Sequence, residues 1–202
     1  MDSLKLDPGS YTGTYKLIGD EICLDFINSV SWQGTEKEHD WLDQPANFIA
    51  WALAVKIIDT RKANLLKARP AADLKKELDK VHALRSDLYK VLHPLGSGRK
   101  PAEESITRLN ALILKISRHR YIDPKKHQWA WVEPSSLTQT LSPVIWNAAH
   151  IITDLNHARI KHCPGCDWIF YDRTRNGSRK WCDMEDCGSR DKSLRYYHRQ
   201  KE

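Results

Sequence analysis

Four cysteines near the C-terminus constrain the fold of this chain more than any other feature. They form two close pairs, Cys163-x2-Cys166 and Cys182-x4-Cys187, separated by fifteen residues. Two pairs at these gaps predict one tetrahedral zinc site, and the Pro164-Gly165 turn allows both thiolates of the first pair to face the same ion. A site closed by four thiolates has no position for water or substrate, so we expect a single structural Zn²⁺ ion.

Two histidines flank the cysteines and are alternative ligands. His162 precedes the first pair and His198 lies in the predicted C-terminal helix, so a mixed cysteine and histidine site is the competing prediction. Cys23 is the fifth cysteine. An odd number with four clustered residues favours a metal site in a reducing compartment over a disulfide framework, and Cys23 is then a small buried hydrophobe.

Hydropathy predicts a folded, mainly helical chain. Of its 202 residues 41% are hydrophobic, which can support one medium domain and a small appendage. Apolar residues recur at helical spacing in segments near 21–28, 45–58, 72–92, 101–119 and 143–156. No apolar run approaches a membrane span, and the N-terminus resembles no signal peptide, so we expect a cytoplasmic protein without a membrane partner.

Short β-strands complete the prediction. Residues 11–18 alternate loosely, and 129–132 are aromatic and β-branched, so we expect these two segments to pair in a small β-sheet. After the first cysteine pair, residues 168–171 predict a strand, and the residues from Cys187 to about Gln200 predict a helix. We call the turn that carries Cys163 and Cys166 the first knuckle and the one that carries Cys182 and Cys187 the second knuckle. A first knuckle, a hairpin, a second knuckle and a helix follow one another in the order of a treble clef. The predicted fold class is therefore α+β: a mainly helical N-terminal domain with a small β-sheet (1–157), followed by a treble-clef zinc finger (158–202).

Charge in the C-terminal segment suggests a nucleic-acid interface. Residues 161–202 carry ten basic and seven acidic side chains, and four zinc-bound thiolates would bring this segment close to neutral, so local clusters matter more than total charge. Two basic clusters stand out, one from Arg173 to Lys180 between the cysteine pairs and one from Lys192 to Arg199 after them. Arg190 lies beside the second cysteine pair, where it either has a structural role or belongs to the same nucleic-acid-binding surface. The candidate DNA-contacting residues are Arg173, Arg175, Arg179, Lys180, Arg190, Lys192, Arg195 and Arg199. The alternative is a solvated surface that balances nearby acids.

Lys192, Arg195 and Arg199 fall on one face of the predicted C-terminal helix. On the opposite face, Leu194 and Tyr197 are expected to pack against the hairpin near Trp168 or Trp181.

The sequence then resembles two known families. Cys163-Pro-Gly-Cys166, Trp168 to Asp172, Arg179-Lys-Trp-Cys182 and Cys187-Gly-Ser-Arg190 are similar to the CGNR zinc finger, and Gly19-Asp-Glu-Ile-Cys-Leu-Asp-Phe-Ile-Asn28 resembles the opening of the ABATE domain of bacterial stress-induced transcription regulators. The resemblance implies a DNA-binding finger joined to a sensor-like domain, with zinc held by the four cysteines. It implies no reaction.

Ser189 stands where the CGNR motif has asparagine. A hydroxyl can retain a capping or backbone hydrogen bond, but it lacks the paired donor and acceptor with which an amide reads a base.

Asp25 and Asn28 are candidate ligand-pocket residues, because polar side chains inside an apolar stretch either line a pocket or hydrogen-bond nearby backbone. Trp32, Trp51 and Trp146 similarly either wall a pocket or pack in the core. A small-molecule effector and a homodimer are the partners that such a sensor domain suggests, besides DNA.

Three classes of function remain in competition. The leading hypothesis is a transcription regulator that contacts DNA through the finger. The second is a protein-interaction or RNA- and single-strand-binding module, in which Tyr196, Tyr197 and Trp168 would stack or anchor. An enzyme has the least support, because no HExxH, GxSxG or phosphate-loop pattern occurs and the predicted metal site is closed.

Overall fold

The computed structural model describes residues 3–199, without the side chains of Arg195 and His198. The N-terminal part consists of β1 (Ser3–Leu4), β2 (Tyr15–Lys16), α1 (Ile22–Ile27), β3 (Val30–Ser31), β4 (His39–Asp40), α2 (Pro45–Ala54), α3 (Thr60–Lys67), α4 (Ala71–Leu92), the 3-10 helix η1 (His93–Ser97), α5 (Glu103–Ser117), β5 (Arg120–Asp123), β6 (Gln128–Trp131), α6 (Leu137–Thr140) and α7 (Ser142–Thr153). The C-terminal part consists of the 3-10 helix η2 (His157–Arg159), β7 (Ile160–His162), β8 (Ile169–Tyr171), the π-helix η3 (Met184–Gly188) and α8 (Ser189–Arg199).

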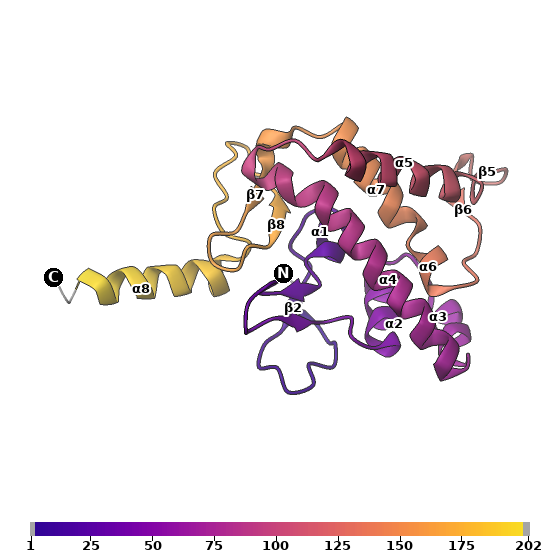
Figure 1. Cartoon of the computed structure of the whole chain (residues 1–202), viewed down its shortest axis with the longest axis horizontal. Helices are drawn as coiled ribbons and strands as arrows, with labels where there is room; N and C mark the ends of the chain where they lie inside the picture. Colours follow the sequence, from indigo (N-terminus) through magenta and orange to yellow (C-terminus); the bar gives the residue numbers. More distant parts are fainter. Residues whose placement is uncertain (1–2, 200–202) are drawn as a thin grey trace.

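The long helix α4 organises the N-terminal part. It lies centrally and contacts α1, α2, α5, α6 and α7 (Figure 1). Its apolar stripe is buried because leucine and valine recur every three or four residues, and burying that stripe stabilises the helix more than its intrinsic propensity does. Mainly helical architecture was predicted and is confirmed. Among residues 3–199, no helix is long and apolar enough to cross a membrane.

The strands form four separate antiparallel pairs: β1 with β2, β3 with β4, β5 with β6, and β7 with β8. The predicted pairing of 129–132 with the N-terminal strand is wrong, since β6 pairs with its neighbour β5 from Arg120↔Trp131 to Asp123↔Gln128. Asp123 favours this local hairpin by accepting hydrogen bonds from the backbone N–H groups of Lys125 and Lys126. Closing a short loop also costs less conformational entropy than pairing distant segments.

The C-terminal hairpin is part of the main hydrophobic core. Ile160 of β7 and Ile169 of β8 are buried in the same cluster as α1, α4 and α7. The Nε1 atom of Trp168 donates to the Val30 carbonyl at 3.0 Å, and the backbone N–H of Tyr171 donates to Gly19 at 2.9 Å. The finger therefore continues the core of the N-terminal part.

Helix α8 projects away from the rest of the molecule (Figure 1). In Figure 1 it extends away from the remaining helices, and its connection to them runs through η3. Leu194 and Tyr197, which were expected to pack against the hairpin, are 54% and 55% exposed, so about half of each side chain faces solvent and their packing against the hairpin stays a prediction.

Candidate metal centre and nucleic-acid interface

The four cysteines meet in one site. The hairpin formed by β7 and β8 encloses the first pair, because Cys163 follows β7 and its N–H bonds the Trp168 carbonyl at 2.8 Å. The hairpin was predicted to follow this cysteine pair, but β7 precedes the pair and β8 follows it. The order of knuckle and hairpin therefore differs from the predicted one, and the treble-clef class stays a prediction. Cys187 comes from η3, which Asp183 caps by accepting from the N–H of Glu185 at 2.7 Å.

The geometry of the sulfur atoms fits a zinc ion. All four Sγ atoms lie within 4.8 Å of one another, with Cys166 and Cys182 at 3.5 Å and Cys182 and Cys187 at 3.6 Å. A tetrahedral zinc ion about 2.3 Å from each sulfur requires sulfurs about 3.8 Å apart. Three of the four thiols are buried. The four cysteines could therefore hold one Zn²⁺ ion, and His162 is not part of their cluster.

Glycines allow the two knuckles to pack closely. A Cβ atom at Gly165 would lie 3.1 Å from the Cβ of Cys187, and one at Gly188 would lie 2.9 Å from the Met184 sulfur. Ser189, at the position of the motif's asparagine, donates its hydroxyl to the Met184 carbonyl at 3.1 Å. The serine thus retains a backbone hydrogen bond at the end of η3.

Arg190 supports the metal centre. Its Nη2 lies 3.1 Å from the Cys187 sulfur and donates to the Gly165 carbonyl at 3.0 Å, while its guanidinium lies over Trp32 at 5.0 Å. A cation at this distance offsets part of the negative charge that four thiolates bring to one ion. Among the predicted DNA-contacting residues, Arg190 is therefore occupied by structural contacts.

Asp172 organises the loop between the two cysteine pairs. It is fully buried, and its carboxylate accepts from Lys161 Nζ at 2.7 Å, from the Thr174 N–H and from the Arg179 N–H, both at 2.9 Å. Burial opposes ionisation, but the Lys161 ammonium and these hydrogen bonds hold the pKa of Asp172 well below its usual range. Sequence reasoning missed Lys161 and Asp172, although a lone acid directly after an apolar strand was a signal.

Two arginines of the loop bind the N-terminal part. Arg179 is only 14% exposed in its side chain, and it pairs with Asp20 and donates to the Ile18 carbonyl at 2.8 Å. Arg173 pairs with Glu21 and donates to the Asp20 carbonyl. Both were predicted to contact DNA, but the structure directs their guanidinium groups toward residues 18–21.

The remaining predicted basic residues lie at the surface. Arg175, Lys180, Lys192 and Arg199 are exposed, and Lys180 lies over Trp181 at 5.0 Å. The side chains of Arg195 and His198 lie outside the described residues.

Asp25 and Asn28 hydrogen-bond to backbone. Asp25 Oδ1 accepts from the N–H groups of Ile18 and Gly19, each at 2.8 Å, and burial raises its pKa to about 7 against these two hydrogen bonds. Asn28 pairs with both the N–H and the carbonyl of Ile169 at 2.9 and 2.7 Å. Asn28 therefore joins α1 to the finger, and a ligand-binding role for either residue stays a prediction.

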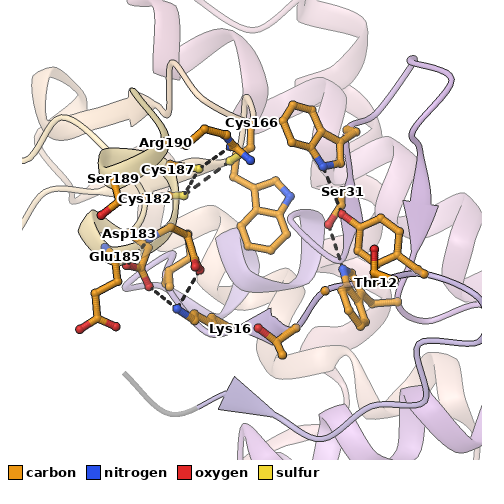
Figure 2. Close-up of a pocket in the computed structure, with 18 of the residues that line it drawn as sticks. Thr12, Lys16, Ser31, Cys166, Cys182, Asp183, Glu185, Cys187, Ser189 and Arg190 are labelled. Carbon is orange, nitrogen blue, oxygen red and sulfur yellow. Dashed lines mark hydrogen bonds and ion pairs between the residues drawn. The ribbon is translucent and has the colours of Figure 1, made fainter. Parts of the chain in front are cut away.

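A pocket of about 480 Å³ lies between the two parts of the chain. Figure 2 shows Thr12, Lys16 and Ser31 of the N-terminal part facing the second cysteine pair and Arg190. Lys16 bridges Asp183 at 2.8 Å and Asp186 at 2.7 Å, and these carboxylates raise its pKa. Trp32 lines this pocket, whereas Trp51 is buried in the core. The pocket thus borders the metal site directly.

Comparison with known families agrees with this architecture. Residues 20–155 match the family described as "ABATE: Putative stress-induced transcription regulator", and residues 159–200 match the "CGNR zinc finger". Among curated proteins, no sequence matches the chain. The first match covers about two thirds of the chain, the second follows it in the expected order, and the four cysteines of the cluster lie within the second. The chain belongs to the ABATE family and carries a C-terminal CGNR zinc finger.

Proposed function

We propose that this protein is a DNA-binding transcription regulator in which the finger contacts duplex DNA and the N-terminal domain binds a small-molecule effector. The observation that carries the proposal is the projection of α8 away from the body (Figure 1). Lys192 and Arg199 are exposed on this helix, and its eleven residues span about 16 Å, which a major groove admits. Arg175 and Lys180 are exposed on the adjoining loop and add candidate phosphate contacts.

The pocket beside the metal site supports effector binding. Its volume lies in the range of small-molecule sites, and both the N-terminal loop and the metal knuckle contribute to its wall. A ligand there would touch Trp32 and Arg190 together, so binding would change the contacts that fix the start of α8. The candidate homodimer stays a prediction.

The decisive experiment is a titration of the zinc-loaded protein against random duplex DNA at two salt concentrations. We expect binding that weakens steeply with salt, and in a Lys192→Ala, Arg195→Ala, Arg199→Ala variant a salt slope smaller by about one for each lost phosphate contact. The matched control replaces three exposed lysines of the N-terminal part, Lys5, Lys67 and Lys76, by alanine. An affinity that falls equally in both variants, or in neither, would remove α8 from the interface.

A second candidate function is supported by the exposed aromatic side chain of Tyr196, which is 68% exposed on α8. Base stacking on such a residue favours single strands. If single-stranded RNA or DNA binds more tightly than the duplex and Tyr196→Ala removes this preference, the single-strand module is the better description.

A further inference from the structure

Three side chains with metal-binding atoms meet where the N-terminal domain touches the first knuckle. His93 begins η1 at the end of α4, His162 ends β7, and Asp167 follows Cys166. Their ligand atoms all lie within 4.8 Å of one another, and none of the three belongs to the four-cysteine cluster. His93 lies 69 positions from His162 and 74 from Asp167 in the sequence, so the group exists only in the folded molecule.

The hydrogen bonds of His162 leave one nitrogen facing a carboxylate. Its Nε2 lies 2.9 Å from the His93 carbonyl oxygen, which can only accept, so Nε2 carries the proton in a neutral ring. Its Nδ1 lies 2.8 Å from Asp167 Oδ1. When the ring is neutral, the lone pair of Nδ1 faces this carboxylate oxygen and the Asp167 carbonyl oxygen, which lies 3.3 Å away. Histidines that bind metals characteristically donate their other N–H to a carbonyl in this way, and a cation between the two atoms would satisfy both.

The distances fit a first-row divalent ion. An octahedral ion about 2.1 Å from its nitrogen and oxygen ligands places adjacent ligands about 3.0 Å apart, and a tetrahedral ion places them about 3.4 Å apart. His93 Nε2 lies 2.9 Å from Asp167 Oδ2, close to the 2.8 Å separation of the His162 pair. The Asp167 side chain is 66% exposed, so its carboxylate can turn to admit the ion from solvent.

The surrounding residues hold these ligands in place. The N–H of Asp167 donates to the Cys163 carbonyl at 2.9 Å, which fixes its left-handed backbone (φ 62°) at the end of the knuckle. The His93 ring stacks on Tyr89 with centroids 4.4 Å apart. Gly96 allows His162 to approach, because a Cβ atom there would lie 2.4 Å from the His162 ring.

We propose that His93, His162 and Asp167 form a second metal site, which takes a borderline divalent ion such as Zn²⁺, Co²⁺ or Ni²⁺. Two imidazoles and one carboxylate suit these ions, and three ligands leave the remaining positions to water, so the site is weaker than the four-thiolate site. His93 belongs to the N-terminal domain, and the other two ligands belong to the finger. An ion bound here clamps the first knuckle to the end of α4.

The test uses the full chain loaded with one equivalent of Zn²⁺ and then titrated with Co²⁺ at one fixed pH, with bound metal measured after equilibrium dialysis. We expect a second equivalent, with a weak visible spectrum typical of nitrogen and oxygen ligands and no thiolate charge-transfer band. In Asp167→Asn and His93→Gln, we expect the affinity of this second ion to fall at least about tenfold.

His150→Gln is the matched control, because His150 forms an exposed pair with Asp154 at 2.8 Å that is not part of either ligand group found among the described residues. Protection of the four thiols from alkylation shows that each variant keeps the first zinc and a folded finger. His93→Gln lies outside the finger and stays informative if Asp167→Asn disturbs the knuckle. Binding of one equivalent only, or a second equivalent unchanged in both ligand variants, would overturn the proposal and leave the group as an ion-paired cluster.

Discussion

At the scale of single residues, Asp172 stabilises the finger through charge as well as through hydrogen bonds. Its carboxylate is fully buried against the Lys161 ammonium and two backbone N–H groups. Since the folded-state pKa of Asp172 lies below the ordinary value of 3.8, this stabilisation is fully present above 3.8 and is lost as the pH falls from there through the lower folded-state pKa.

Replacing Asp172 by asparagine should lower the free energy of unfolding by roughly 1–3 kcal/mol, because the half-buried Lys161 ammonium loses its charged partner and one of the buried carboxylate's hydrogen-bond donors is left without an acceptor. Urea titration of the zinc-loaded protein measures this change. Asp154→Asn, at an exposed position paired with His150, should stay within about 0.5 kcal/mol of the wild type. Equal effects at the two positions would mean that the buried carboxylate is not the stabilising group.

Asp25 predicts a pH dependence of the opposite sign. Burial raises its pKa to about 7, so the folded state retains a proton that the unfolded chain releases at about 3.8. The stability gained from this bound proton is therefore fully present below the unfolded-state pKa of about 3.8, and it is lost as the pH rises toward the folded-state pKa of about 7. In Asp25→Asn the amide oxygen still accepts from Ile18 and Gly19, and this pH dependence should disappear.

The measurement is the unfolding free energy of both proteins between about pH 5.5 and 8, where thiolate ligands keep their metal. The wild type should gain stability relative to Asp25→Asn as the pH falls below 7. Parallel curves would contradict a raised pKa.

At the scale of elements, η3 depends on a residue far away in sequence. Lys16 of β2 bridges Asp183, which caps η3, and Asp186 within it. Lys16→Met should leave Asp183, whose side chain is 11% exposed, without its cation and should loosen the segment that carries Cys187. We expect faster amide hydrogen exchange at 184–188 and faster loss of zinc to a chelator. Lys5→Met, at an exposed position, should change neither rate.

The elements also show where prediction from sequence works. Long periodic helices such as α4 and α5 were predicted close to their bounds because their apolar faces are read directly from spacing. Helix α3 was missed, since it buries only Ala63 and Leu66 and has too few apolar positions to show a period. The pairing of β6 was wrong because the alternation of a strand says nothing about its partner.

The metal ligands were predicted because their spacing alone specifies the chemistry. The sequence does not distinguish arginines with a structural role from those that are free to bind a partner. Arg175 and Arg179 have similar sequence surroundings, and only the fold brings Arg179 against the Ile18 carbonyl. For the same reason, the meeting of His93 with His162 could not be foreseen.

At the scale of the whole molecule, one hydrophobic core spans both families' segments, because Ile160 and Ile169 pack with the helices of the N-terminal part. Removing zinc with a chelator should therefore destabilise the entire chain. We expect one cooperative thermal transition, lowered by more than about 10 °C, because zinc contributes several kcal/mol to a module that shares its core with the rest. Calorimetry with and without metal measures this shift. Two transitions, with the larger one unmoved by the chelator, would show that the finger unfolds independently.

The shared core has a consequence for the evolution of such proteins. A zinc module that folds independently can be moved from one protein to another by recombination of its gene segment. Here the hairpin around the first cysteine pair supplies Ile160 and Ile169 to the interior of its neighbour, and Asn28 of that neighbour holds the backbone of the hairpin. Each segment would expose part of this shared core if it were separated, so we expect the two to be inherited together. A graft of residues 159–200 onto another protein would need a host that buries Ile160 and Ile169.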